Sequence, residues 1–316
     1  MSEPILEVKN LKKYFRTPSG PLQAVDDVSF AINKGETLGV VGESGCGKST
    51  LGRTILRLHE PTSGQILFHG EDITGYNARK LKALRAKMQI IFQDPYSSLN
   101  PRATVSQAIA EPLIIQRVLR RRDKDAIEKR VDEMMDLVGL AKRFKNSYPH
   151  ELDGGRRQRI GIARALALNP EFIVCDEPVS ALDVSIQAQI LNLMQDLQEQ
   201  LGLTYMFITH DLSVVKHLSE RIIVMYLGQI VEEAPPQELF DNPVHPYTKA
   251  LLSAIPVPDP DVKMERIMVK GEITSPVNMP PGCRFAKRCP YATGECSKPL
   301  AAKEINPGHS ASCCMI

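Results

Sequence analysis

Apolar and polar residues follow two different periods along most of the chain. Alternation with a period of two predicts strands at 5–8 and 28–32, and short apolar runs predict buried strands at 37–41 and 172–175. Because predicted strands alternate with predicted helices, we expect an α/β fold with a mostly parallel sheet. The helices are predicted at 48–58, 105–139, 160–168 and 185–201, and further strands at 64–68, 71–73, 204–209 and 221–226.

The pattern changes after about residue 235, where prolines become frequent. We expect a small, loop-rich module at 236–316, appended to a larger domain at 1–235. No internal repeat or low-complexity tract is visible. The prolines that mark the module are Pro235, Pro236, Pro243, Pro246, Pro256, Pro258, Pro260, Pro276, Pro280 and Pro281.

Composition narrows the class of protein. The chain has 316 residues, 43% of them hydrophobic, and a net charge of +2, which argues against a nucleic-acid partner. The start at Met1–Pro4 is not basic and no apolar stretch follows it, so no secretory signal is expected. Apolar runs stay far below the roughly 20 residues that span a bilayer. We expect a cytosolic protein, or one peripheral to the cytoplasmic face of a membrane.

A glycine-rich segment at 42–49 follows a predicted strand and opens a predicted helix, as a P-loop does. Glycines let backbone N–H groups approach phosphate oxygens, and the helix N-terminus favours an anion. We expect Lys48 to reach the β- and γ-phosphates and the Ser49 hydroxyl to hold Mg²⁺. The alternative is a turn without a ligand. The candidate binding residues are Gly42, Ser44, Gly45, Cys46, Gly47, Lys48, Ser49 and Thr50.

Two carboxylates end the apolar strand at 172–175. A strand end is where a P-loop enzyme places the aspartate of its Mg²⁺ shell, so Asp176 is a candidate metal contact. Glu177 is the candidate general base, which orients or deprotonates the attacking water. An acidic strand end without function is the alternative, and it is less favoured in a chain that also carries a P-loop.

With these motifs in place the chain resembles the ATP-binding-cassette (ABC) family over about residues 5–235. Gln93, in Ile90–Pro95, resembles the Q-loop, which in that family senses Mg²⁺ and contacts the membrane partner. Ser180–Asp183 resembles the D-loop, and His210 resembles the switch histidine at the γ-phosphate.

Tyr14 resembles the aromatic residue that stacks on adenine in this family. The resemblance implies a P-loop NTPase fold of the ABC type. Such a fold has a RecA-like core, an antiparallel β subdomain and a helical subdomain, here at about 100–160. It also implies ATP and Mg²⁺ as cofactors.

The family signature, Leu-Ser-Gly-Gly-Gln, reads Leu152-Asp153-Gly154-Gly155-Arg156 here. In the family this segment binds the γ-phosphate held by the opposite subunit. Asp153 caps a helix as well as serine does, but a carboxylate about 4 Å from a phosphate costs about 1 kcal/mol in water and about 4 at a dielectric of 20. Arg156 offsets part of this cost by pairing. We expect one impaired composite site, hence a heteromeric ATPase partner; an engineered substitution stays open as the origin of Asp153.

The segment Asn242–Leu252 resembles the start of the extension on ATPases of oligopeptide and dipeptide importers. Nickel and glutathione importers carry a related extension. Phe92–Arg102 and Met225–Gly228 agree with the F-type subunits of peptide importers. The resemblance implies an ATPase that powers peptide import, with transmembrane permease subunits, a second homologous ATPase and an extracytoplasmic binding protein as partners. A soluble cassette ATPase of translation or DNA repair, and a regulator without turnover, are the alternatives.

Five of the seven cysteines lie near the C-terminal end. Cys283, Cys289 and Cys296, followed by Cys313 or Cys314, supply four thiolates for a soft metal. The tight pair typical of zinc sites is absent, and the F-type resemblance implies a 4Fe–4S cluster, with Cys313 as the better fourth ligand. Zinc, or unliganded thiols and a disulfide, stay open. The remaining two, Cys46 and Cys175, are interpreted as ordinary small residues.

Overall fold

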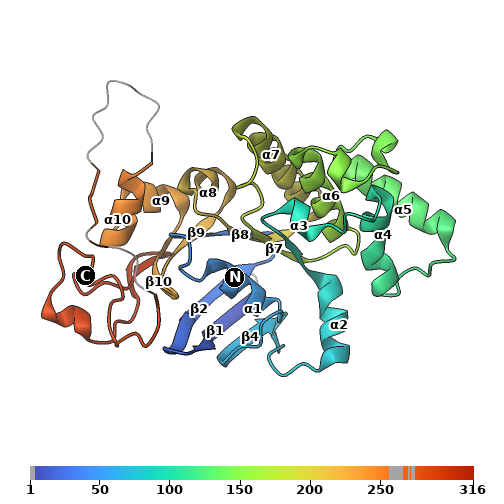
Figure 1. Ribbon diagram of the computed structural model, residues 1–316. Coiled ribbons are helices and arrows are strands. Elements are labelled where there is room, and N and C mark those ends of the chain that lie inside the picture. Colours follow the sequence, from blue (N-terminus) through green and yellow to red (C-terminus); the bar gives the residue numbers. More distant parts are fainter. Residues whose placement is uncertain (1–3, 256–265, 270, 272–274) are drawn as a thin grey trace, which may run out of the picture. The chain divides into compact units, whose positions relative to one another are not determined.

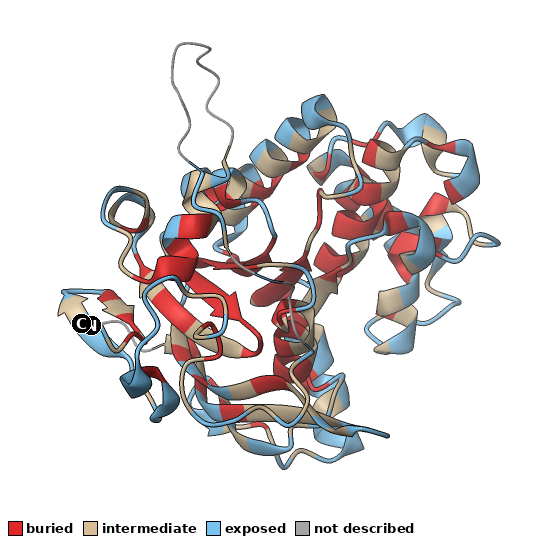
Figure 2. Ribbon diagram, turned by 60° about the vertical axis from the view of Figure 1, so that its left-hand side comes forward, coloured by how far each residue is buried: buried red, intermediate tan, exposed pale blue. Residues whose placement is uncertain are grey.

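The computed structural model describes residues 4–255, 266–269, 271 and 275–316. Residues 1–3 lie outside the described residues. So do three of the prolines that mark the C-terminal module, Pro256, Pro258 and Pro260. Contacts divide the chain into two compact units, and buried residues gather inside each of them (Figures 1 and 2). The first unit comprises Met1–Thr74 and Phe207–Ile316, and the second comprises Gly75–Met206.

The first unit contains an antiparallel sheet in the order β2-β1-β4-β5 (Figure 1). Its long strands have 14 residues each and pair through several bulges, whereas alternation alone predicted only their first or last few residues. These strands are half-buried, so their outer parts lack a regular apolar pattern. The strands are β1 (Pro4–Thr17), β2 (Gly20–Asn33), β4 (Ser63–Phe68) and β5 (Glu71–Asp72).

A second group of strands in the same unit runs in the order β11-β12-β10-β9-β3. The pair β3 and β9 is parallel and buried, as continuous apolar runs predict. The next strand, β10, pairs antiparallel with both β9 and β12, so the C-terminal strands extend this sheet rather than form a separate layer. The strands are β3 (Thr37–Val41), β9 (Arg221–Tyr226), β10 (Gln229–Ala234), β11 (Lys303–Asn306) and β12 (His309–Ala311).

The helices of the first unit are short. The P-loop helix α1 ends at Ile55, three residues before the predicted end, because Arg57 adopts a left-handed φ of 53° and its buried guanidinium donates to the carbonyls of Ile73 and Thr74. Two helices lie in the segment predicted to be loop-rich. The helices are α1 (Lys48–Ile55), α8 (Leu212–Leu218), α9 (Pro236–Asp241) and α10 (Pro246–Ser253), with a 3₁₀ turn at Gly294–Ser297.

The second unit is mainly helical, with α4, α5 and α6 packed against one another (Figure 1). The predicted helix at 105–139 is two helices, because Arg117 has a φ of 62° and the Arg120 N–H donates to the Asp123 carboxylate between them. The helices are α2 (Ala78–Lys87), α3 (Pro95–Ser98), α4 (Val105–Ile115), α5 (Lys124–Leu137), α6 (Gly154–Leu166) and α7 (Val184–Leu201), with 3₁₀ turns at Lys142–Phe144 and Pro149–Glu151.

Two strands of the second unit, β6 (Met88–Ile91) and β7 (Phe172–Asp176), pair in parallel and end at functional motifs. Strand β8 (Thr204–Ile208) covers the boundary between the units along the chain. Within the described part of the chain, none of the helices has the length and apolar character needed to cross a bilayer.

Candidate functional site

The P-loop connects β3 to α1 in the first unit, and three of its glycines have positive φ. A Cβ on Gly42 would lie 2.2 Å from the Met225 carbonyl, and one on Gly47 would lie 2.0 Å from the Ala24 carbonyl. Only glycine therefore lets this loop pack against β9 and β2. A Cβ on Gly45 would meet nothing within 4 Å, so there the φ of 79° alone requires glycine.

The residues predicted to bind phosphate lie at the start of α1 and in the loop before it. The helix cap at Gly47 carries no side-chain hydrogen bond, and the first turn of α1 holds no acidic residue, which leaves the helix N-terminus suited to an anion. The buried Lys48 ammonium donates to the carbonyls of Gly42 at 2.7 Å and Glu43 at 3.1 Å. Ser49 and Thr50 follow on α1 and are half-buried.

His210 is exposed and follows β8. Its neighbour Thr209 is buried and donates its backbone N–H to the Val40 carbonyl at 3.1 Å. Since Val40 lies two residues before Gly42, this bond places the histidine segment next to the strand that leads into the P-loop. The structure thus brings two sequence-predicted elements together in the first unit.

Tyr14 lies on β1 and its hydroxyl donates to Asp26 Oδ1 on β2. Burial, together with this carboxylate, raises the pKa of the Tyr14 phenol above its ordinary value. The backbone N–H of Tyr14 donates to Thr62 Oγ1 at 2.9 Å. The ring therefore has a fixed anchor at its polar end, and Asp26 is a residue that the sequence motifs did not indicate.

In the second unit, the structure brings Gln93 and Glu177 together. Gln93 Nε2 donates to Glu177 Oε2 at 2.8 Å, although 84 positions separate the two residues. Parallel pairing of β6 with β7 explains this contact, because the two motifs follow the same ends of neighbouring strands. Asp176 is buried at the end of β7. Glu177 has a φ of 49°, which is unusual for a residue with a side chain and is found at functional sites.

The signature segment begins α6. Asp153 is the N-cap and accepts from the Arg156 N–H at 2.8 Å, while its second oxygen forms an ion pair with the Arg156 guanidinium. The helix consequently begins at Gly154, six residues before the predicted start. A Cβ on Gly155 would lie 2.7 Å from Ile186, and one on Gly154 would lie 3.0 Å from Leu182. The acidic residue is thus compatible with the fold and is partly neutralised by arginine.

The C-terminal cysteines were predicted to supply four metal ligands. Cys296 Sγ lies 3.0 Å from Cys314 Sγ, whereas the prediction preferred Cys313. Burial raises the pKa of the Cys283 thiol to about 11, and nearby thiols, including those of Cys296 and Cys313, act in the same direction. Among the residues the structure describes, however, no three His, Cys, Asp or Glu side chains are arranged to hold a metal ion. The described cysteines are therefore not arranged as a ready set of ligands, either for a zinc ion or for the predicted cluster.

Sequence motifs also missed three residues after position 240, of which two contact the P-loop and one contacts β2. Tyr247 on α10 accepts the Glu43 N–H at 2.8 Å, and Arg288 donates to Glu43 Oε2 at 2.9 Å. Buried Arg284 donates to Asp26 Oδ2 at 2.5 Å, next to the Tyr14 anchor. More than 200 positions separate the partners in each contact, so no local signal in the sequence indicates them.

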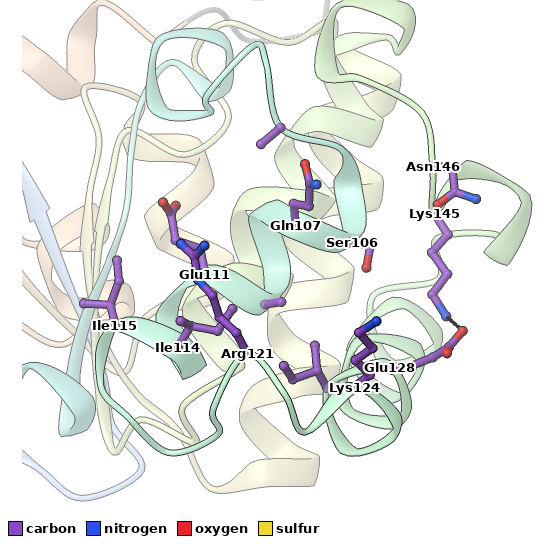
Figure 3. A pocket seen from close by; sticks show the side chains of 13 residues that line it. Ser106, Gln107, Glu111, Ile114, Ile115, Arg121, Lys124, Glu128, Lys145 and Asn146 are labelled. Carbon is purple, nitrogen blue, oxygen red and sulfur yellow. Dashed lines mark hydrogen bonds and ion pairs between the residues drawn. The ribbon is translucent and has the colours of Figure 1, made fainter.

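A cavity of about 720 Å³ lies beside α4 in the second unit. Side chains of α4, α5 and the loop between them line it, and Lys145 Nζ contacts Glu128 Oε1 at 2.7 Å on one side (Figure 3). Ile115 at its rim is 59% exposed, which is unusual for a large apolar side chain.

Comparisons with known proteins agree with these features. The model of the ABC transporter family matches residues 25–180, and that of the oligopeptide/dipeptide transporter C-terminal region matches residues 231–296. The oligopeptide transport ATP-binding protein AppF of Bacillus subtilis (strain 168) is 54% identical over 98% of this chain and 97% of its own length. For OppF of the same organism the values are 55%, 99% and 97%.

Solved structures show the same fold. The ATP-binding cassette MJ0796, in a dimeric post-hydrolysis state with ADP and Pi, matches 73% of this chain and 98% of its own, with 32% identity and a TM-score of 0.66. The protein cbiO1 of Clostridium perfringens, part of the transporter complex cbiONQ, matches 76% and 92%, with 30% identity and a TM-score of 0.67. This chain therefore belongs to the ABC transporter family of ATP-binding proteins, in the group that carries the oligopeptide/dipeptide transporter C-terminal region.

Proposed function

We propose that this ABC ATPase powers the import of dipeptides or oligopeptides across the cytoplasmic membrane. The observation that carries the proposal is the P-loop geometry, joined to a C-terminal region of the peptide-transporter type. The high identity to AppF and OppF over nearly the whole chain supports peptides as the cargo class. The domain limits proposed with it are 1–235 for the cassette and 236–316 for the C-terminal module.

Each candidate residue receives a chemical role. The Lys48 ammonium and the α1 N-terminus neutralise the phosphates. A bound Mg²⁺ ion would be held by the Ser49 hydroxyl, Asp176 and Gln93. Glu177 orients or deprotonates the attacking water. His210 stabilises the γ-phosphate. Tyr14 stacks on adenine. The phosphate loop is completed by Gly42, Ser44, Gly45, Cys46, Gly47 and Thr50. The nucleotide of a second ATPase subunit is faced by Asp153, Gly154 and Gly155.

Hydrolysis is tested with Glu177→Gln in the complex with its permease. The amide keeps the size of the side chain but is not a base, so we expect ATP turnover to fall at least about 100-fold while ATP binding persists. Turnover at the wild-type rate would remove Glu177 from the proposed chemistry. Stimulation of wild-type turnover by peptide, with the binding protein present, tests the cargo class.

The partners follow from the same proposal. Transmembrane permease subunits anchor this chain to the cytoplasmic face of the membrane, and an extracytoplasmic peptide-binding protein acts indirectly. The cavity beside α4 is the proposed permease contact, because exposed Ile115 offers apolar surface among its lining residues, and exposed Val118 follows in the loop after α4. Ile115→Glu should reduce co-purification of the permease, whereas a similar change at exposed Leu201 on α7 should not.

We also propose a second, homologous ATPase subunit rather than a homodimer. The carboxylate of Asp153 repels a phosphate, and the Arg156 pair offsets only part of that repulsion. A partner with a serine in its signature would complete the site that uses this chain's Lys48. Asp153→Ser keeps the helix cap and should raise turnover of the assembled complex. Unchanged turnover would count against the impaired site.

For the cysteines we propose a 4Fe–4S cluster held by Cys283, Cys289, Cys296 and either Cys313 or Cys314. The supporting observations are that Cys296 Sγ lies 3.0 Å from Cys314 Sγ and that the Cys283 N–H donates to the Cys296 carbonyl at 2.8 Å, since cysteine thiolates are the ligands of such clusters. The bound cluster would supply a structural staple for a proline-rich segment. Anaerobically purified protein should be brown and contain about four iron atoms per chain. Colourless protein that contains zinc and no iron would refute the cluster.

A further inference from the structure

We propose that Arg284 and Arg288, on the short C-terminal segment 283–289, are positioning residues that hold the two ends of the ATP site. Arg288 acts on the phosphate end through Glu43, and Arg284 acts on the adenine end through Asp26 and Tyr14. The inference rests on the proposed nucleotide site and adds residues to it that no motif includes. All of the contacts lie within the first unit.

The phosphate end is held through both groups of Glu43. Its carboxylate accepts from the Arg288 guanidinium at 2.9 Å, and its backbone N–H donates to the Tyr247 hydroxyl at 2.8 Å. The Glu43 carbonyl in turn accepts from Lys48 Nζ at 3.1 Å. Arg288 also donates to the Tyr226 hydroxyl at 3.4 Å, which fixes the guanidinium. The C-terminal segment thus fixes the residue that orients the P-loop lysine.

The adenine end is held through a chain of three side chains. Arg284, which is 7% exposed, donates to Asp26 Oδ2 at 2.5 Å, and Asp26 Oδ1 accepts from the Tyr14 hydroxyl. A carboxylate bound on both sides has little freedom to rotate, so the Tyr14 ring is fixed in one orientation. Burial lowers the pKa of the Arg284 guanidinium and the nearby carboxylate acts against that change.

The two ends also meet through the backbone. Arg284 donates to the Leu227 carbonyl and to Gln23 Oε1, the latter at 2.5 Å. The residue after Leu227 is Gly228, whose N–H donates to the P-loop carbonyl of Cys46 at 2.7 Å. One buried guanidinium therefore joins β2 to the β9–β10 turn, whereas the bond from Gly228 to the P-loop is made by the backbone and does not involve Arg284. A surface-exposed arginine would make fewer bonds and would not order these segments.

If Arg284 and Arg288 act on different ends of the ATP site, substitutions of the two arginines should affect two ligand probes differently. Binding of Mg–ATP and of Mg–tripolyphosphate, which lacks the adenosine, is measured by calorimetry on the full-length chain in its transporter complex. Arg284→Lys should weaken ATP about tenfold and leave tripolyphosphate within about twofold. Arg288→Ala should weaken both probes about tenfold, because it acts through Lys48. Lys287→Ala, an exposed neighbour, is the charge-matched control and should change neither.

Tyr14→Phe removes only the hydroxyl anchor, and it provides a second variant if Arg284→Lys folds poorly. It should weaken ATP as Arg284→Lys does, and the double variant should lose no more than either single one. If the wild-type protein bound ATP and every variant bound both probes as tightly as Lys287→Ala does, the positioning role would be overturned but the nucleotide site would stand. Equal loss on both probes for Arg284→Lys, or additive loss in the double variant, would also overturn the positioning role. A wild-type complex that binds neither probe would instead refute the nucleotide site.

Discussion

One residue of the candidate site, Glu177, has a backbone conformation that is unfavourable for a residue with a side chain. Glu177 has a positive φ although it is not glycine, and it lies beside Gln93. Such backbone costs about 1 kcal/mol or more and persists where the surroundings enforce it. Here the hydrogen bonds from Ser180 to the Glu177 carbonyl enforce it, at 3.3 Å from the N–H and 3.1 Å from the hydroxyl.

A buried histidine provides a test at the same scale. His245 caps α10, and burial lowers its pKa from 6.5 to about 4. The unfolded chain binds a proton at higher pH than the folded one, so stability is complete above pH 6.5 and falls as pH drops towards 4. The loss is about 2 kcal/mol at pH 5. Urea midpoints at pH 7.5 and 5 should differ more for wild type than for His245→Asn; equal differences would contradict this.

The P-loop and α1 form the element proposed to bind the phosphates, and the glycines of the loop are required for different reasons. Gly45→Ala meets no atoms and should cost about 1 kcal/mol of unfolding free energy through its φ alone. Gly47→Ala adds a clash with the Ala24 carbonyl and should cost about 3 kcal/mol or more. Denaturant titrations of both variants measure which substitution lowers the free energy of unfolding more. If Gly45→Ala were the more damaging, the packing of the loop on β2 would be misassigned.

Elements with a continuous apolar run or a motif were predictable, and those set by distant partners were not. The strands β3, β7 and β9 were predictable because β3 and β7 are buried throughout and β9 is buried after its first residue. Strands β11 and β12 have only four and three residues; β12 pairs with β10, and the mostly exposed β11 pairs with β12. The start of α6 was predicted six residues late because residues 154–159 include no apolar side chain that would mark a helical period.

The candidate site was predicted unevenly for the same reason. The P-loop, the acidic strand end and the exposed His210 carry local signals, and the structure places each at the end of a buried strand. Arg284 and Arg288 carry none, because their partners lie more than 200 positions away. In the cysteine segment the close pair joins Cys296 to Cys314, a detail that depends on side-chain direction rather than spacing.

At the scale of the whole chain, the C-terminal strands are fastened to the first unit by His309. Its ring contacts Glu232 on β10 at 2.9 Å and Glu238 on α9 at 3.2 Å. Glu232 is fully buried, so removing a partner leaves a buried carboxylate with fewer bonds. His309→Leu should lower the unfolding free energy by about 3 kcal/mol, and His309→Gln, which keeps a donor, by less. Identical urea midpoints for both variants would argue against this fastening.

The central claim is that the loop at 42–49 binds a triphosphate through its backbone amides and Lys48. Calorimetric titration of Mg–ATP into the well-folded chain, alone and in its transporter complex, tests it most directly. We expect saturable binding of one nucleotide per chain, which Lys48→Ala weakens at least about 100-fold while the unfolding midpoint stays close to that of wild type. Absence of Mg–ATP binding by the wild-type protein in both preparations would contradict the account.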